Sequence, residues 1–167
     1  MVVNKEHIKI VIQRHLLDVL QGYDFVKTPR CGAMHSFVGS IRDTDFRASK
    51  KDVVEKIKAI YYESYEAMAE KQISTIARAI IESYFPIDSE IRLYVAIRLG
   101  LVSVGEDSIV VWASSKRRHT SMDIVMSVLQ QVKRSVVIWK KIIFCDGTEE
   151  WADSCKSEAE WLKHKEI

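Results

Sequence analysis

The chain has 167 residues, 47% of them hydrophobic, which is enough to build one domain around a single core. Its 25 Lys and Arg residues nearly balance its 23 Asp and Glu residues, so the formal net charge is only +2. This balance excludes a protein that coats nucleic acid through a general basic excess, and any anion site must be a local cluster. We expect residues 1–167 to form a single domain, with a core at about 29–151 and a C-terminal tail at 152–167.

The cysteines and the hydropathy pattern point to a reduced, cytosolic setting. Cys31, Cys145 and Cys155 are odd in number and form no C-x-x-C pair, which argues against a disulfide framework or a zinc site. No apolar run approaches the roughly 20 residues that a membrane span needs, and no secretory-type apolar stretch follows the polar start. The histidines have no metal-ligand spacing, and no nucleotide-binding fingerprint is present. We therefore expect a soluble cytoplasmic protein with no metal, no cofactor and no membrane partner.

The first half of the chain alternates between β-rich segments and helical periodicity. Residues 8–12 are β-branched and predict a strand, 16–26 predict a helix, and a strand is expected at 33–42 after a Pro-containing turn. Residues 43–52 are charged and lack periodicity, which predicts an exposed loop, and 53–65 alternate as an extended segment does.

The second half carries two amphipathic helices and further strands. Apolar residues recur at helical spacing before Pro86, namely Ala69, Ile73, Ile76, Ala77, Ile80 and Tyr84. Segments 91–98 and 108–114 are typical of strands joined by a turn region at 100–107, and 138–144 is typical of another strand. The stripe of the second helix consists of Met122, Val125, Met126, Leu129 and Val132. The pattern predicts a mixed α+β fold.

A basic cluster at 116–119 directly precedes the second helix, for which Thr120 is the expected N-cap. Cations at this end oppose the helix dipole, so they are either fully solvated or hold an anion together with free backbone N–H groups. From composition alone, a solvated basic turn is slightly favoured.

Lysines also lie within the last predicted strand. Alternation places Lys140 on the face shared by Ile138, Ile142 and Phe144, where a partly desolvated ammonium binds an oxyanion more strongly than it does in water. An edge strand protected by its lysines explains the same pattern. Lys133 lies at the border of a helix stripe, where a lysine usually snorkels to solvent.

Arg42 ends the strand that contains Gly39, and taken alone it is typical of a surface charge. A glycine inside a strand permits close approach of a ligand or of another backbone, although a bulge explains it equally well.

Taken in order, several short motifs resemble the molybdopterin synthase large-subunit family over most of the chain, from about 29 to 151. The matching stretches are Cys31-Gly32-Ala33, Phe37-Val38-Gly39-Ser40-Ile41-Arg42, Tyr62-Glu63-Ser64-Tyr65 with Met68-Ala69, Arg98-Leu99-Gly100 with Val104-Gly105-Glu106, Ser114-Ser115 with Arg118, Ile138-Trp139-Lys140-Lys141, Asp146-Gly147 and Trp151. Each stretch is short, and it is the occurrence of all of them in this order that is specific to the family.

The resemblance implies an α/β-hammerhead fold, with a mixed sheet, flanking helices and a small additional β subdomain. It also implies a homodimer of large subunits within a heterotetramer, and a small ubiquitin-like subunit whose Gly-Gly thiocarboxylate tail donates sulfur. The implied acceptor is cyclic pyranopterin monophosphate, and the implied product is the dithiolene of molybdopterin, the precursor of the molybdenum cofactor.

The family's functional positions can be carried over residue by residue. The resemblance implies that Lys140 lies nearest the thiocarboxylate and that Lys133 is a second catalytic lysine. The implied substrate-binding residues, some acting across a dimer interface, are Arg42, Arg117, Arg118, Lys141 and His119.

The chain departs from the family pattern at several positions. Ile97 and Arg117 stand where the family usually has histidines, and arginine can hold a phosphate but cannot exchange a proton near neutral pH. His119 is a candidate to replace the missing histidines in an acid–base step. Val137 and Ile142 replace a usual proline and a usual acidic residue.

An active enzyme is the favoured hypothesis, and two alternative functions are considered beside it. A noncatalytic paralogue would keep the partner surface and act as a binding module. A small RNA-binding module built on residues 116–119 is disfavoured, because stacking aromatics are not interleaved with the basic residues.

Overall fold

The computed structural model describes residues 6–47, 49 and 53–152. The predicted tail beyond Ala152, including Cys155, lies outside these residues. In chain order the elements are β1 (Ile8–Gln13), α1 (Val19–Val26), β2 (Ala33–Ser40), β3 (Thr44–Phe46), β4 (Val54–Glu63), α2 (Glu66–Tyr84), β5 (Arg92–Arg98), β6 (Gly100–Ser103), β7 (Asp107–Ser115), α3 (Arg118–Ser135), β8 (Trp139–Phe144) and β9 (Glu149–Trp151).

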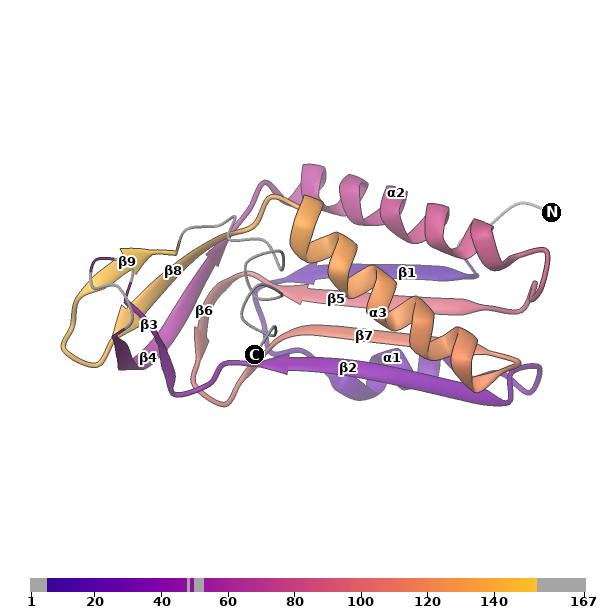
Figure 1. The fold of residues 1–167 in the computed structure, drawn as a ribbon, viewed down its shortest axis with the longest axis horizontal. Coiled ribbons are helices and arrows are strands. Elements are labelled where there is room, and N and C mark those ends of the chain that lie inside the picture. The colour runs from indigo at the N-terminus through magenta and orange to yellow at the C-terminus, as the bar shows by residue number, and fades with distance from the viewer. Residues whose placement is uncertain (1–5, 48, 50–52, 153–167) are drawn as a thin grey trace, which may run out of the picture.

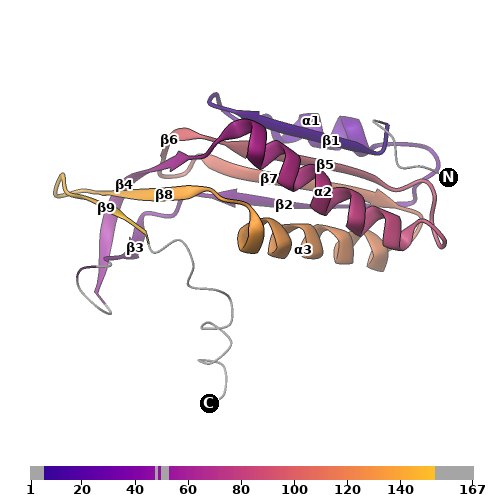
Figure 2. The same ribbon diagram turned by 90° about the horizontal axis from the view of Figure 1, so that it is seen from above.

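A four-stranded sheet in the order β1-β5-β7-β2 forms one layer of the molecule, and helices cover both of its faces (Figure 1). Figure 2 shows α1 on one side of this sheet and the pair α2 and α3 on the other. The central strand β5 is buried on both faces. Leu93 and Val95 pack toward α2 and α3, while Tyr94 and Ala96 pack toward α1. This double coverage explains why the strand is almost continuously apolar in the sequence.

A second sheet lies beside the end of the first and has the order β3-β4-β8-β9, with β6 also paired to β4. Its small core contains Ile57, Ile60, Val102, Ile142 and Phe144. Together with the helix-covered sheet, this second sheet confirms the predicted α+β class with an additional β subdomain.

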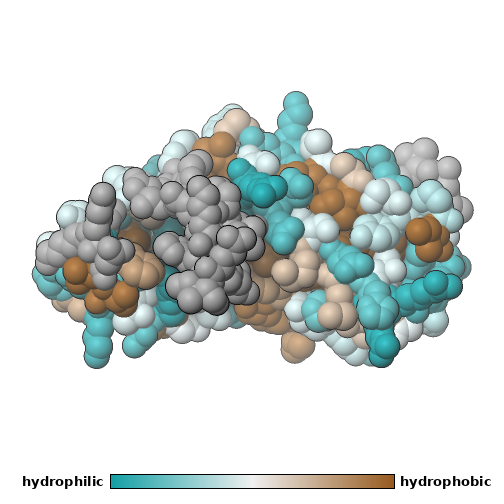
Figure 3. Space-filling model, in the orientation of Figure 1, coloured by the Kyte–Doolittle hydropathy of each residue, from teal (hydrophilic) through white to brown (hydrophobic). Residues whose placement is uncertain are grey.

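The outer faces of α2 and α3 are mostly hydrophilic, with smaller apolar areas between the polar side chains (Figure 3). The buried stripe of α2 consists of Ala69, Ile73, Ala77 and Ile81. Both helices are therefore amphipathic and are held by their inner faces. None of the helices that the structure describes is long and apolar enough to span a bilayer.

The predicted exposed loop at 43–52 is wrong for its first part. Thr44–Phe46 form β3, and the side chains of Asp45 and Arg47 are buried. Burial of these charges is possible because each has partners of opposite charge. Arg47 Nη2 lies 2.5 Å from Glu55 Oε2 and 2.7 Å from Asp146 Oδ2.

Two helix starts also differ from the prediction. The first helix begins at Val19 rather than at residue 16, because Asp18 caps it by accepting a hydrogen bond from the Leu20 N–H at 2.9 Å. The helix α3 begins at Arg118, so Thr120 is not its N-cap.

The predicted stripe of α3 is partly wrong as well. Met122 and Met126 are exposed, whereas Ile124 and Val128 are buried. The other three residues of the predicted stripe are buried together with Ile124 and Val128, namely Val125, Leu129 and Val132. The expected turn region at 100–107 likewise contains the strand β6.

Gly22 allows α1 to lie directly on the sheet. A Cβ atom at this position would be 2.2 Å from Trp112 Cδ1 and 2.8 Å from Tyr94 Cδ1. The Trp112 ring has little freedom to move, because its Nε1–H donates to the Val19 carbonyl at 3.1 Å.

We predict that Gly22→Ala lowers the free energy of unfolding by about 2 kcal/mol, because overpacking outweighs the better helix propensity of alanine. Urea denaturation measures this change. Gly32→Ala is the control, since its Cβ would meet only the Lys116 carbonyl oxygen at 3.4 Å. Equal stability of the two variants would contradict the packing argument.

Asp146 ties the turn between β8 and β9 to Arg47. Hydrogen bonds from the Thr148 hydroxyl and the Thr148 backbone N–H, assisted by Arg47, lower the pKa of Asp146 from 3.8 to about 2. A carboxylate with a depressed pKa stabilises the folded state above its unfolded pKa, and this contribution is lost as the pH falls through the folded pKa.

We therefore predict that Asp146→Asn is less stable than the unsubstituted protein near pH 7. The difference should shrink as the pH falls from 3.8 toward 2. Thermal unfolding at a series of pH values tests this, and a difference that grows toward acid would contradict it.

Candidate functional site

A pocket of about 610 Å³ lies where the two sheets meet the C-terminal end of α3. Its lining comes from β2, β3, β4, β5, β7, α3 and β8, with the residues that follow β2 and α3. Four of the lining side chains are cationic: Arg42, Arg98, Lys133 and Lys140. Asp45 is the acidic residue of the lining. This surplus of positive charge makes the pocket a candidate anion-binding site.

Lys140 reaches the pocket through strand alternation, as the sequence predicts. It shares its face of β8 with the buried Ile142 and Phe144, and antiparallel pairing places it opposite Tyr62 of β4. The side chain is 30% exposed, and its Nζ donates to Asp45 Oδ2 at 2.5 Å. The ammonium is therefore both partly desolvated and held in place.

Asp45 is the partner of two cations. Besides Lys140, it accepts a hydrogen bond from Arg42 Nη2 at 3.1 Å. Burial alone would raise the pKa of this carboxyl, but the hydrogen bond and charge of Lys140 outweigh burial, and the pKa lies below its usual value. The carboxylate is consequently ionised at neutral pH.

Arg42 follows β2 and lines the pocket, with most of its side chain facing solvent. Its Nε donates to the Thr44 carbonyl at 2.9 Å, and its side chain is 68% exposed. The guanidinium is thus oriented by two bonds while most of its surface stays available to a ligand.

Lys133 enters from the last turn of α3, where a cation also interacts favourably with the helix dipole. Its Nζ lies 5.8 Å from the centre of the Phe37 ring of β2. Three cations from separate parts of the sequence, Arg42, Lys133 and Lys140, therefore line one cavity.

Two further polar residues of the lining, Arg98 and Tyr62, were not predicted as site residues. Arg98 is 8% exposed, and its Nη1 lies 3.0 Å from Glu106 Oε2. Burial raises the pKa of Tyr62, and a hydrogen bond with Ser108 offsets part of this rise, so the phenol stays protonated at neutral pH. The available signal for Arg98 was a charged residue directly after the apolar run of β5, which also begins with an arginine.

The structure does not bring every predicted site residue into this pocket. Lys141 lies on the opposite face of β8, where its Nζ is 2.6 Å from Glu149 Oε2 and 5.7 Å from the centre of the Trp151 ring. Ile97, which stands where a histidine is usual, is 4% exposed and contributes an apolar surface to the lining.

The basic cluster lies at the other end of α3. Arg117, Arg118 and His119 are exposed around its first turn. Fifteen residues of helix separate Arg118 from Lys133, which corresponds to about 22 Å at the rise of an α-helix. Within one chain, this cluster is remote from the pocket.

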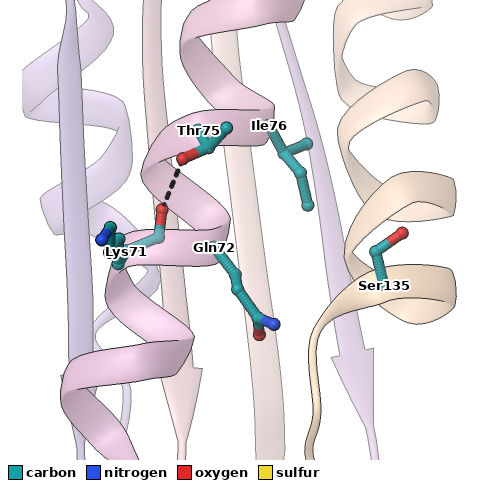
Figure 4. Close-up of a pocket in the computed structure, with 5 residues that line it drawn as sticks. All are labelled: Lys71, Gln72, Thr75, Ile76 and Ser135. Carbon is teal, nitrogen blue, oxygen red and sulfur yellow. Dashed lines mark hydrogen bonds between the residues drawn. The ribbon is translucent and has the colours of Figure 1, made fainter.

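A smaller pocket of about 310 Å³ lies between α2 and α3 (Figure 4). It is lined by Lys71, Gln72, Thr75, Ile76 and Ser135. The Thr75 hydroxyl already donates to the Lys71 carbonyl at 2.9 Å. With one cation and little polar surface to spare, this groove is the weaker candidate for an anion.

A helix-covered sheet that shares a cation-lined pocket with a smaller β subdomain defines an α+β protein with a candidate site for an anion. The chain belongs to the family described as MoaE protein, whose model matches residues 12–135. The resemblance inferred from the sequence motifs is thereby confirmed.

Named relatives agree with this assignment. The chain is 32% identical over 155 residues to the molybdopterin synthase catalytic subunit of Dictyostelium discoideum, covering 92% of each protein. It is 35% identical over 149 residues to catalytic subunit 1 of Aedes aegypti, covering 88% of each.

Solved structures show the same fold. Molybdopterin synthase from Staphylococcus aureus superposes with a TM-score of 0.72 at 25% identity, over 90% of this chain and 98% of that one. A chain from the complex of subunits 1 and 2 of molybdopterin-converting factor from Helicobacter pylori gives a TM-score of 0.65 at 21% identity, over 90% and 92%. This last likeness concerns the fold alone.

Proposed function

We propose that this chain is the catalytic large subunit of a molybdopterin synthase. It transfers sulfur from the thiocarboxylated C-terminus of a small ubiquitin-like subunit to cyclic pyranopterin monophosphate. The observation that carries the proposal is the shared pocket of Arg42, Lys133 and Lys140. The sulfur donor and the phosphorylated acceptor are both anions, and fixed cations are what such ligands require.

The positions of the cations suggest a division of roles. Lys140 is partly desolvated and held by Asp45, which suits it to the thiocarboxylate and to the oxyanion that forms at its carbonyl carbon. Arg42 is exposed and presents a planar guanidinium, which matches a phosphate. Lys133, in the last turn of α3, is the third cation that binds the acceptor.

The transfer itself consists of two bond exchanges for each sulfur. The thiocarboxylate sulfur forms a bond to a carbon of the pterin side chain while the bond from that carbon to oxygen breaks. At one carbon the leaving oxygen belongs to the cyclic phosphate, and at the other it is lost as water. The tail stays attached through the sulfur as a thioester. Water then cleaves the acyl–sulfur bond, so the tail departs as a carboxylate and the sulfur stays on the pterin. A second tail repeats the exchange, and opening of the cyclic phosphate accompanies formation of the dithiolene.

The proposed assembly is a homodimer of large subunits, each with one small subunit, in the cytosol. The complex of two subunits named for the Helicobacter pylori structure supports a small-subunit partner. In such a dimer, Arg117, Arg118 and His119 would act in the pocket of the partner protomer, because α3 holds them far from their own. His119 would then supply an imidazole that position 97 lacks.

We predict that Lys140→Ala lowers the rate of molybdopterin formation about 100-fold, since losing one donor to an oxyanion costs roughly 3 kcal/mol of transition-state stabilisation. Lys133→Ala should cause a loss of similar size. Lys58→Ala is the control, because Lys58 is an exposed lysine of the neighbouring strand β4 that does not line the pocket, and it should stay within about twofold of wild type.

The assay combines each variant with thiocarboxylated small subunit and cyclic pyranopterin monophosphate, and calorimetry measures binding of the small subunit. Wild-type protein that binds the small subunit but forms no product would reject the enzyme and favour the noncatalytic binding module. A Lys140→Ala variant with normal turnover would reject the role of Lys140.

A further inference from the structure

A buried carboxylate connects two of the pocket's cations. Asp45 Oδ2 accepts from Lys140 Nζ at 2.5 Å, while Oδ1 accepts from Arg42 Nη2 at 3.1 Å. The Asp45 side chain is 10% exposed, against 30% for Lys140 and 68% for Arg42. The carboxylate thus lies beneath two cations whose other surfaces face the cavity.

The backbone holds this carboxylate in place. Oδ1 also accepts a hydrogen bond from the Phe46 N–H at 2.9 Å, and Asp45 is paired with Glu55 of β4 in the register of β3. Both carboxylate oxygens are therefore engaged, and one of them is bonded to main chain. A side chain fixed in this way serves as a support for the cations, whereas a mobile one would compete with the ligand for them.

The charges of the pocket show why a support is needed. Arg42, Lys133 and Lys140 repel one another, and Arg98 adds a fourth cation that Glu106 compensates. Ile142, two residues along the same face of β8, is apolar and 4% exposed. Asp45 is thus the compensating charge for Lys140, while the phenol of Tyr62 contributes none because it stays protonated.

We propose that Asp45 is a positioning residue that fixes the Lys140 ammonium and the Arg42 guanidinium at a set separation, aimed into the cavity. The inference rests on the proposed function, because it assigns the spacing of these cations a role in sulfur transfer. A displacement of about 1 Å at a reacting group can cost roughly 100-fold in rate, so a support of this kind affects turnover more than binding.

Steady-state kinetics of three variants test the proposal. Asp45→Asn removes the charge and Asp45→Glu keeps the charge but shifts it outward. Both should lower kcat at least tenfold, and they should change KM for cyclic pyranopterin monophosphate by a smaller factor because Arg42 also loses its support. Asp43→Asn, two residues away and exposed, should behave as wild type. A kcat within twofold of wild type in Asp45→Glu, or a fall in kcat accompanied by an equal rise in KM, would overturn the proposal.

Acetylation of lysines, followed by mass spectrometry, tests the ion pair without any turnover. Lys140 should label at least threefold faster in Asp45→Asn than in wild type, and it should remain protected in Asp45→Glu. The exposed Lys58 is the internal reference and should label equally in all three proteins. Unchanged Lys140 labelling in Asp45→Asn would overturn the proposal.

The two measurements separate the possible failures. If wild type has no synthase activity, the proposed function fails, while the labelling still decides whether Asp45 holds Lys140. If Asp45→Asn does not fold, Asp45→Glu carries the test alone, because protection of Lys140 combined with reduced kcat is expected only when the position of the charge matters.

Discussion

The antiparallel pairing of β4 with β8 is the constraint on which the site depends. It places Lys140 opposite Tyr62 and turns the face of β8 that carries Lys140 toward the cavity. Because β8 follows α3 after only three residues, the same pairing also brings the last turn of α3, with Lys133, to the cavity edge. A shift of one residue in this register would turn Lys140 away and Lys141 inward.

Concentrating cations in a small cavity carries an electrostatic cost that neighbouring carboxylates reduce. Asp45 compensates Lys140 and Arg42, and Glu106 compensates Arg98. Lys133 has the least need of compensation, since it is exposed and interacts with the dipole of its own helix. The lining keeps a positive surplus, which explains how a chain with a formal charge of +2 can offer a local candidate site for an anion.

Much of this arrangement can be predicted from the sequence, because strand and helix periodicity decide which side chains share a face. Alternation placed Lys140 on the face of Ile142 and Phe144, and helical periodicity placed Lys133 at the border of the apolar stripe, but only the resemblance to the family gave these lysines a role in a site. Asp45 was missed because β3 has only three residues and lies in a charged segment without periodicity. Its contact with Lys140 joins residues that are 95 positions apart in the sequence, and periodicity contains no information about such a contact. The sequence places the basic cluster before the helix that carries Lys133, so the wide separation of the two follows from that predicted helix, which the structure shows as α3.

The continuous helix α3 fixes the distance between the basic cluster at its first turn and Lys133 in its last turn. A substitution on its outer face leaves the spacing unchanged. Insertion of a single residue would rotate everything downstream by about 100° and advance it by about 1.5 Å. Lys133 would then swing away from Phe37, and the entry of the chain into β8 would be displaced as well. In this protein, helix length is therefore under a stricter geometric requirement than the identity of most residues on the helix surface.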